Sequence, residues 1–184
     1  MKVLTLDTEA LTEHCRRLEI AVRADFVPDV VVGIARGGAV VSSLMFDGLP
    51  HLEARCQRPS TANKDAARPW VWKLVRSMPI FIRDWLRVAE VRWLSRNAAC
   101  HRQPVVDIAQ PLPDGVCKVL VVDDAVDSGA TLSAVVKALS REGLEVRTAA
   151  ITVTRKDACI KPDYCIYDDE TLIRFPWSKD VRQK

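Results

Sequence analysis

The sequence predicts an α/β fold built on a doubly wound parallel sheet. Two runs dominated by valine, leucine and isoleucine, at 30–34 and 118–122, are typical of strands buried on both faces of such a sheet. Segments with the 3.6-residue hydrophobic period of helices, at 8–24 and 131–141, alternate with these runs. A chain of 184 residues can bury one core but is short for two domains, so we expect a single domain over residues 1–184.

The first helix is expected to be capped by Thr8 and to run to about Ala24. The second is expected to open at 35–38 and to end at Gly48. Its inward-facing residues should be Val40, Val41, Leu44 and Met45. Weaker patterns predict strands at 51–58, 145–154 and 164–166 and a loop at 125–130.

Residues 59–104 interrupt this alternation with a basic, tryptophan-rich insert. The insert holds nine basic and three acidic residues, and Pro69 and Pro79 predict two helices, at about 69–78 and 79–97. Three interpretations are open: a lid or dimer surface, a helix pair that contacts a protein partner or membrane surface, and a nucleic-acid contact.

Composition excludes several classes of protein. No apolar run approaches the roughly 18 residues of a membrane span, so no transmembrane segment is expected. The first ten residues lack an apolar signal core, which favours a cytoplasmic location. The six cysteines form no CxxC pair, as expected of reduced thiols. A net charge of +3 is too small for binding nucleic acid by charge alone.

Residues 119–132, Val-Leu-Val-Val-Asp-Asp-Ala-Val-Asp-Ser-Gly-Ala-Thr-Leu, hold the main candidate site. A buried strand would deliver two carboxylates to the ligand-binding edge of the sheet. The loop and helix N-terminus that follow offer backbone amides and hydroxyls to a phosphate group. Two carboxylates beside a phosphate would repel it unless sugar hydroxyls or Mg²⁺ lay between them. The pattern therefore predicts a sugar phosphate bound with a metal.

This stretch resembles the ribose-phosphate signature of the type I phosphoribosyltransferases, which use 5-phosphoribosyl-1-pyrophosphate with Mg²⁺. The resemblance implies that Asp123 and Asp124 bind the ribose hydroxyls and the metal. It implies that the loop around the 5-phosphate comprises Asp127, Ser128, Gly129, Ala130 and Thr131.

The sequence Gly-Ile-Ala-Arg-Gly-Gly at 33–38 is similar to the family's pyrophosphate loop, in the form seen in bacterial xanthine–guanine enzymes. Paired glycines allow backbone amides to approach an anion, and arginine adds a fixed cation. The resemblance implies pyrophosphate contacts from Ala35, Arg36, Gly37 and Gly38, with Arg36 in a catalytic role. It also implies that Asp127 handles the proton at N7 of a 6-oxopurine. The alternative for Asp127 is a cap of the following helix.

The C-terminal residues 155–184 resemble the base-binding hood of xanthine–guanine and archaeal-type hypoxanthine enzymes, which ends on a Pro-Trp pair. Lys156 matches the lysine that contacts the purine 6-oxo group, and Leu172 and Ile173 match the base-contacting positions. Leu172 stands where relatives carry an aromatic ring. Ser178 stands where they commonly carry an acidic residue, which weakens any second metal contact there.

Taken together, the resemblance implies a purine phosphoribosyltransferase, a pentosyltransferase that assembles as a dimer or tetramer. Its substrates would be phosphoribosyl pyrophosphate and a 6-oxopurine: guanine, xanthine or hypoxanthine. The alternative is a regulatory or binding protein that keeps the phosphoribosyl pyrophosphate pocket without turnover. Asp127 and Arg36 favour the enzyme, whereas Leu172 and Ser178 favour the alternative.

Overall fold

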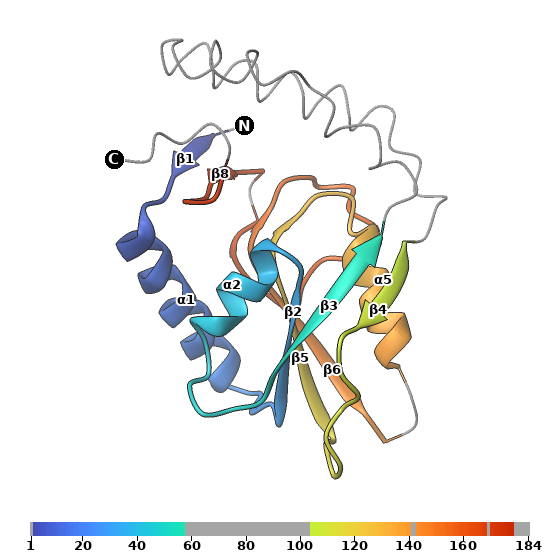
Figure 1. The fold of residues 1–184 in the computed structure, drawn as a ribbon. Coiled ribbons are helices and arrows are strands. Elements are labelled where there is room, and N and C mark those ends of the chain that lie inside the picture. Colours follow the sequence, from blue (N-terminus) through green and yellow to red (C-terminus); the bar gives the residue numbers. More distant parts are fainter. Residues whose placement is uncertain (1, 58–103, 141–142, 169, 179–184) are drawn as a thin grey trace.

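A computed structural model describes residues 2–57, 104–140, 143–168 and 170–178 (Figure 1). The predicted insert at 59–104 lies outside these residues, apart from Pro104, so its two expected helices stay predictions. The strands of the central sheet are β2 (Val30–Ile34), β3 (His51–Gln57), β4 (Val105–Ile108), β5 (Lys118–Val126), β6 (Glu145–Val153) and β7 (Tyr164–Tyr167). In the described part of the chain they form one sheet in the order β4-β3-β2-β5-β6-β7.

The sheet is parallel except at one edge, where β4 runs antiparallel to β3. Helices α1 (Thr8–Arg23) and α2 (Gly37–Ser43) cover one face, and α5 (Ala130–Leu139) covers the other (Figure 1). Each face has its own apolar core, one formed with α1 and α2 and one with α5. Helices on both faces of a mostly parallel sheet confirm the predicted α/β class.

The order of the strands reverses between β2 and β5. From β2 the chain moves to β3 on one side, and from β5 it moves to β6 on the other, although β2 and β5 are neighbours. Ligands of open α/β sheets bind at the carboxyl ends of the strands at such a reversal. The fold therefore places the residues that follow β2 and β5 where a ligand is expected.

A second, small sheet joins the two ends of the chain and was not predicted. Strand β1 (Val3–Thr5) pairs in parallel with β8 (Leu172–Arg174). Two backbone hydrogen bonds extend the pairing at its ends. The Leu6 amide donates to the Arg174 carbonyl at 2.9 Å, and the Leu172 amide donates to the Lys2 carbonyl at 2.8 Å. The C-terminal segment is thereby fixed beside the start of α1.

The caps and ends of the helices differ from the predictions. Asp7, not Thr8, caps α1: its carboxylate accepts a hydrogen bond from the Ala10 amide at 2.8 Å, a favourable place for a negative charge. Helix α2 ends at Ser43 and not at Gly48: Leu44, with a ψ of 2°, leaves the helical conformation, and the fully buried Phe46, with a φ of 53°, turns the chain further on.

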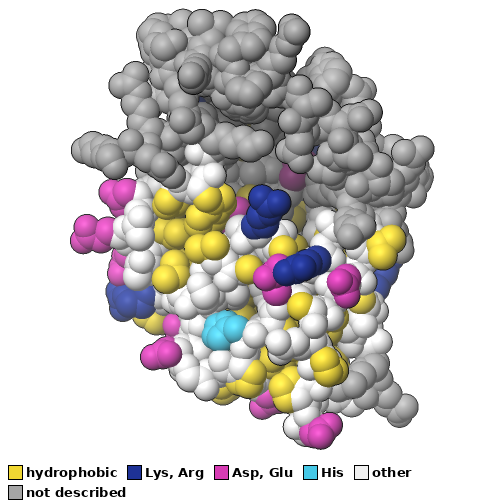
Figure 2. Space-filling model, viewed as in Figure 1, with side chains coloured by type: hydrophobic (Ala, Val, Ile, Leu, Met, Phe, Trp, Pro, Cys, Tyr) yellow, Lys and Arg dark blue, Asp and Glu magenta, His cyan; other side chains and the backbone are white. Residues whose placement is uncertain are grey.

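Two residues that were expected on the inward face of the second helix are exposed, one in α2 and one just after it. Val40 and Leu44 keep 41% and 38% of their surface accessible, while Val41 and Met45 are buried as expected. Hydrophobic side chains gather on the face where this helix lies (Figure 2). The short helix therefore buries a narrower stripe than its sequence suggested.

Strand β5 is longer than predicted and includes the acidic pair. Pairing with β6 continues at Asp123–Ala150, Ala125–Thr152 and Val126–Val153, so the expected loop at 125–130 shrinks to 127–129. Carboxylates are poor strand signals, and here the backbone ladder outweighs that preference. No described helix is both long and apolar enough to cross a bilayer.

Candidate functional site

The two motifs singled out in the sequence meet at the carboxyl ends of β2 and β5. Gly33 is paired with Val122 in the register of these strands, so the residues that follow each strand emerge side by side. Segment 35–38 begins α2, and segment 123–131 runs from the acidic pair to the start of α5. The fold thus brings together, at one edge, residues separated by about ninety positions.

Glycines allow α2 to pack directly against the end of β5. A Cβ atom on Gly38 would overlap the Val122 carbonyl oxygen and lie 2.8 Å from the Cα of Asp123. A Cβ atom on Gly37 would overlap the carboxylate of Asp124. At position 38 only glycine fits, because the atoms in the way belong to the backbone, whereas at position 37 a side chain would have to displace the Asp124 carboxylate.

The two carboxylates of the acidic pair lie on different sides of β5, as successive residues of an extended strand do. Asp123 lines a pocket together with loop and helix residues, namely Ala125, Val126, Asp127, Ser128, Gly129, Thr131 and Leu132. Asp124 instead lies against Gly37 at the start of α2. The pair therefore faces two neighbouring compartments at the end of the strand.

Asp124 is held by several hydrogen bonds in a partly buried place. Its Oδ1 atom accepts from the Ala125 amide at 3.0 Å, and its own amide donates to Oδ1 of Asp123 at 2.9 Å. Burial raises the pKa of Asp124 above its usual value, and hydrogen bonds with Asp123, the Ala125 amide and the side chain of Trp177 act in the opposite direction.

The loop before α5 has the form of a phosphate cradle. Gly129 adopts a φ of 78°, and a Cβ atom there would lie 2.7 Å from the carbonyl oxygen of Ile160. The Ser128 carbonyl accepts from the Cys159 amide at 2.9 Å, which ties the loop to the segment after β6. Helix α5 begins at Ala130, and Thr131 and Leu132 of its first turn line the same pocket as Asp123.

Asp127 does not cap α5, so that alternative is wrong. The cap position belongs to Gly129, and the side chain that accepts from the first amide of the helix, that of Ala130, is the hydroxyl of Ser128, at 3.4 Å. The Asp127 carboxylate instead accepts a hydrogen bond from the Thr154 hydroxyl at 3.2 Å, and the Thr154 amide donates to Val126 at 2.9 Å. Thr154, at the end of β6, was not predicted as a site residue; its only signal was its place after a buried strand.

Arg36 occupies the cap position of α2 with its side chain exposed. The peptide bond between Ala35 and Arg36 is cis. In the described part of the chain, no ion pair or hydrogen bond of the Arg36 guanidinium is found, so the cation faces outward beside the two glycines. Arg36 and the amides of α2 thus lie on the side of β5 that also holds Asp124.

The residues expected to meet a base are less closely gathered. Lys156 is exposed and forms an ion pair with Glu170, with 3.6 Å between Nζ and Oε2. Leu172 and Ile173 are both buried, and Ile173 packs in the core with α1 and α2. Of the three, only Lys156 presents its side chain to solvent.

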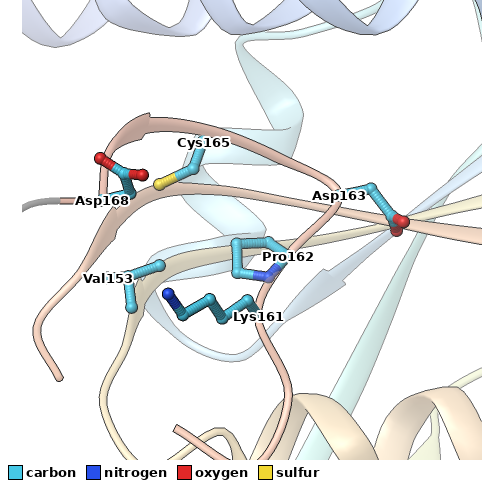
Figure 3. A pocket seen from close by; sticks show the side chains of 6 residues that line it. All are labelled: Val153, Lys161, Pro162, Asp163, Cys165 and Asp168. Carbon is cyan, nitrogen blue, oxygen red and sulfur yellow. The ribbon is translucent and has the colours of Figure 1, made fainter. Parts of the chain in front are cut away.

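A second pocket, of about 250 Å³, lies beside the edge strand β7 (Figure 3). Lys161, Cys165 and Asp168 line it, while Asp163 turns away, its carboxylate accepting from the amide and hydroxyl of Thr148 (Figure 3). Burial raises the pKa of the Cys165 thiol to about 11, so this thiol is a poor nucleophile. The pocket contains none of the predicted site residues.

The acidic pair has the chemistry of a Mg²⁺ site that depends on its substrate. The described residues contain no group of three or more His, Cys, Asp and Glu side chains placed to hold a metal. Mg²⁺ is usually held by one or two carboxylates together with substrate phosphates and water. Asp123 and Asp124 supply hard oxygen ligands of that kind.

Comparison with known proteins agrees with the motifs. Residues 96–183 match the family described as the phosphoribosyl transferase domain. A hypoxanthine/guanine phosphoribosyltransferase of Methanocella paludicola is 33% identical over 57 residues, which are 31% of this chain and 30% of that protein. The match therefore spans less than a third of that relative.

Two solved structures share the fold over nearly the whole chain. The purine phosphoribosyltransferase of Pyrococcus horikoshii superposes with a TM-score of 0.63 at 22% identity, covering 100% of both chains. The xanthine-guanine-hypoxanthine phosphoribosyltransferase of Helicobacter pylori gives a TM-score of 0.59 at 17% identity, covering 96% of this chain and 93% of that one. The chain thus has the fold of these phosphoribosyltransferases, and its residues 96–183 are similar to the phosphoribosyl transferase domain.

Proposed function

We propose that this protein transfers the 5-phosphoribosyl group of phosphoribosyl pyrophosphate to a purine base and releases pyrophosphate. A bond forms between a ring nitrogen of the base and C1 of the ribose, the bond from C1 to the pyrophosphate oxygen breaks, and the nitrogen loses its proton. The observation that carries the proposal is the meeting of segment 35–38 with segment 123–131 at one sheet edge.

The ribose 5-phosphate would occupy the pocket between β5 and α5. The amides at the start of α5 and the hydroxyls of Ser128 and Thr131 suit a phosphate dianion, and the left-handed Gly129 lets the backbone turn around it. Asp123 lines the same pocket, so its carboxylate would accept hydrogen bonds from the ribose hydroxyls.

The pyrophosphate would lie on the other side of the strand end, above the start of α2. Arg36 and the amides of Gly37 and Gly38 would bind its oxygens and stabilise the negative charge that develops as it leaves. Mg²⁺, when bound by Asp124 and Asp123 with the substrate, would neutralise charge on the same oxygens. Ala35 contributes backbone to this loop.

The base would lie toward residues 155–184, which we propose to act as a hood. Asp127 would accept the proton of the purine nitrogen, with Thr154 fixing its carboxylate. Lys156 would bind the 6-oxo group of guanine, xanthine or hypoxanthine, once its ion pair with Glu170 is exchanged. Because an exposed ion pair contributes about 1 kcal/mol or less, this exchange costs little. Leu172 and Ile173 would provide the apolar side of the hood.

Pyrophosphate release, measured with Mg²⁺, phosphoribosyl pyrophosphate and each base in turn, tests the proposal. We expect turnover with at least one of guanine, xanthine and hypoxanthine. Turnover with adenine or uracil alone would overturn the choice of base. Asp127→Asn should lower kcat more than the affinity for phosphoribosyl pyrophosphate, whereas the double variant of Asp123 and Asp124 to Asn should abolish binding.

The alternative, a binding protein without turnover, is favoured by none of the comparisons. It would bind phosphoribosyl pyrophosphate with Mg²⁺ and release no pyrophosphate with any base, so the same assay separates the two. We further propose that the chain forms a homo-oligomer, for which sedimentation velocity is the direct measurement.

A further inference from the structure

Residues 154–163 connect β6 to β7 and lie against the loop that precedes α5; we call them the strap. The strap is bonded to the end of β5 where it begins, because the Thr154 amide donates to the Val126 carbonyl at 2.9 Å. Further along, the Cys159 amide donates to the Ser128 carbonyl, also at 2.9 Å. The strap is therefore tied to the chain on both sides of Asp127.

The far end of the strap is anchored on β6. The Asp163 carboxylate accepts from the amide and the hydroxyl of Thr148, at 2.8 and 2.7 Å, and the Asp163 amide donates to the Thr148 hydroxyl oxygen at 2.9 Å. Thr148 is buried, so these hydrogen bonds are shielded from water. With both ends of the strap fixed to the sheet, the position of its middle depends on what that part packs against.

Ile160 determines where the middle of the strap lies. Its side chain packs against the apolar core between α5 and the sheet. Its backbone lies directly on Gly129, where a Cβ atom would come within 2.7 Å of the Ile160 carbonyl oxygen, 2.9 Å of its nitrogen and 3.1 Å of its Cγ2 atom. Ile160 thus connects the core under α5 to the left-handed turn of the loop at 127–129.

We propose that Ile160 is a positioning residue that holds the loop at 127–129 in the shape that binds the ribose 5-phosphate. This inference rests on the proposed function. With a shorter side chain, the middle of the strap loses its anchor in the core and can lift from Gly129. The hydrogen bond from the Cys159 amide to Ser128 then opens, and the loop is free to change its turn. The compartment at the start of α2 lies on the other side of β5, so pyrophosphate binding should not depend on Ile160.

Two substitutions of Ile160 test this role. Ile160→Ala removes the anchor, whereas Ile160→Val keeps both branches at Cβ. We expect the Kd for phosphoribosyl pyrophosphate with Mg²⁺, measured by calorimetry, to rise about tenfold in Ile160→Ala, as for one lost hydrogen bond to a charged group. It should rise less than twofold in Ile160→Val. The Kd for pyrophosphate with Mg²⁺, which would fill only the compartment at the start of α2, should stay unchanged in both variants.

Leu144→Ala is the matched control, because Leu144 packs against the same core but precedes β6, at the opposite end of that strand from the strap. Both truncations to alanine should lower the Tm, and only Ile160→Ala should weaken substrate binding. Hydrogen exchange of the Cys159 amide gives a readout that a loss of stability alone would not move. It should be about tenfold faster in Ile160→Ala and unchanged in Leu144→Ala.

The possible results separate this inference from the function on which it rests. A wild-type Kd or an unchanged exchange rate of the Cys159 amide in Ile160→Ala would overturn the inference alone. So would an equal loss of affinity for pyrophosphate, or the same rise in Kd in Leu144→Ala. A wild-type protein that does not bind phosphoribosyl pyrophosphate would overturn the proposed function and this inference with it.

Discussion

Replacing Gly38 by alanine tests whether the contact between α2 and β5 builds the site. The added Cβ atom would overlap the Val122 carbonyl oxygen and approach the Cα atom of Asp123 to 2.8 Å, so it meets backbone in the centre of the sheet. Neither atom can rotate away as a side chain could. Helix α2 therefore has to withdraw by about 1 Å to regain ordinary van der Waals separation.

The loss of stability and of activity follows from that displacement of α2. Overpacking of this kind destabilises proteins by about 1–3 kcal/mol, and at about 2–4 °C per kcal/mol for a chain of this length the Tm should fall by about 2–12 °C. Because the same helix carries Arg36 and Gly37, the substrate site moves with it. A misplacement of about 1 Å can cost about a hundredfold in activity.

Thermal unfolding and calorimetric binding of phosphoribosyl pyrophosphate measure the two effects separately. Gly37→Ala is the matched comparison, because its Cβ atom would meet only the side chain of Asp124. It should lose affinity while its Tm stays close to that of the wild type. If Gly38→Ala melts at the wild-type temperature, Gly38 is not needed for the close packing of α2 against β5, and the reasoning is refuted.

Three further predictions concern single contacts. Thr154→Val removes the hydrogen bond to Asp127 and should lower kcat, measured as pyrophosphate release, about tenfold with little change in Tm. An unchanged kcat would refute the role of Thr154. The pKa of Asp29 lies below its usual 3.8 because its carboxylate accepts hydrogen bonds from the backbone amides at the start of β5. Asp29→Asn should therefore lower the Tm at pH 7, and this difference in Tm should vanish as the pH falls well below 4. A difference in Tm that is the same at pH 3 and pH 7 would contradict this. Burial raises the pKa of the Cys15 thiol to about 12, so iodoacetamide at pH 8 should label the exposed Cys117 and Cys159 before Cys15, as peptide mass spectrometry can show. Equal labelling would show that Cys15 is accessible.

Buried strands could be predicted from the sequence because their signal is local. The run at 30–34 is apolar throughout and forms β2 with the predicted bounds, since every residue of it is buried. Strands β1 and β8 have three residues each, too few for a periodic pattern, and form only because they pair with each other. The acidic pair was expected after a strand and not within it, because pairing with β6 is invisible in a local pattern.

In the candidate site, too, local features could be predicted from the sequence and contacts between distant residues could not. Its glycines, acidic pair and loop could be proposed from residue types in order along the chain, since each binds through backbone or through adjacent side chains. The contacts Thr154–Asp127 and Cys159–Ser128 join segments apart in sequence, so only the fold reveals them. The inward position expected for Leu44 was wrong because the helix ends at Ser43, so Leu44 no longer follows the helical period.

The two carboxylates face neighbouring compartments at the end of β5, and this placement limits what kind of ligand can use both. Asp123 faces the pocket at the start of α5, and Asp124 faces the start of α2, where Arg36 and the paired glycines lie. Each compartment has its own helix N-terminus or loop amides for an anion. A ligand that engages both must carry anionic groups at two ends of a compact, hydroxyl-bearing centre that crosses the end of β5. A nucleoside base alone or a single phosphate would leave one compartment empty, whereas a ribose with a 5-phosphate and a 1-pyrophosphate spans both.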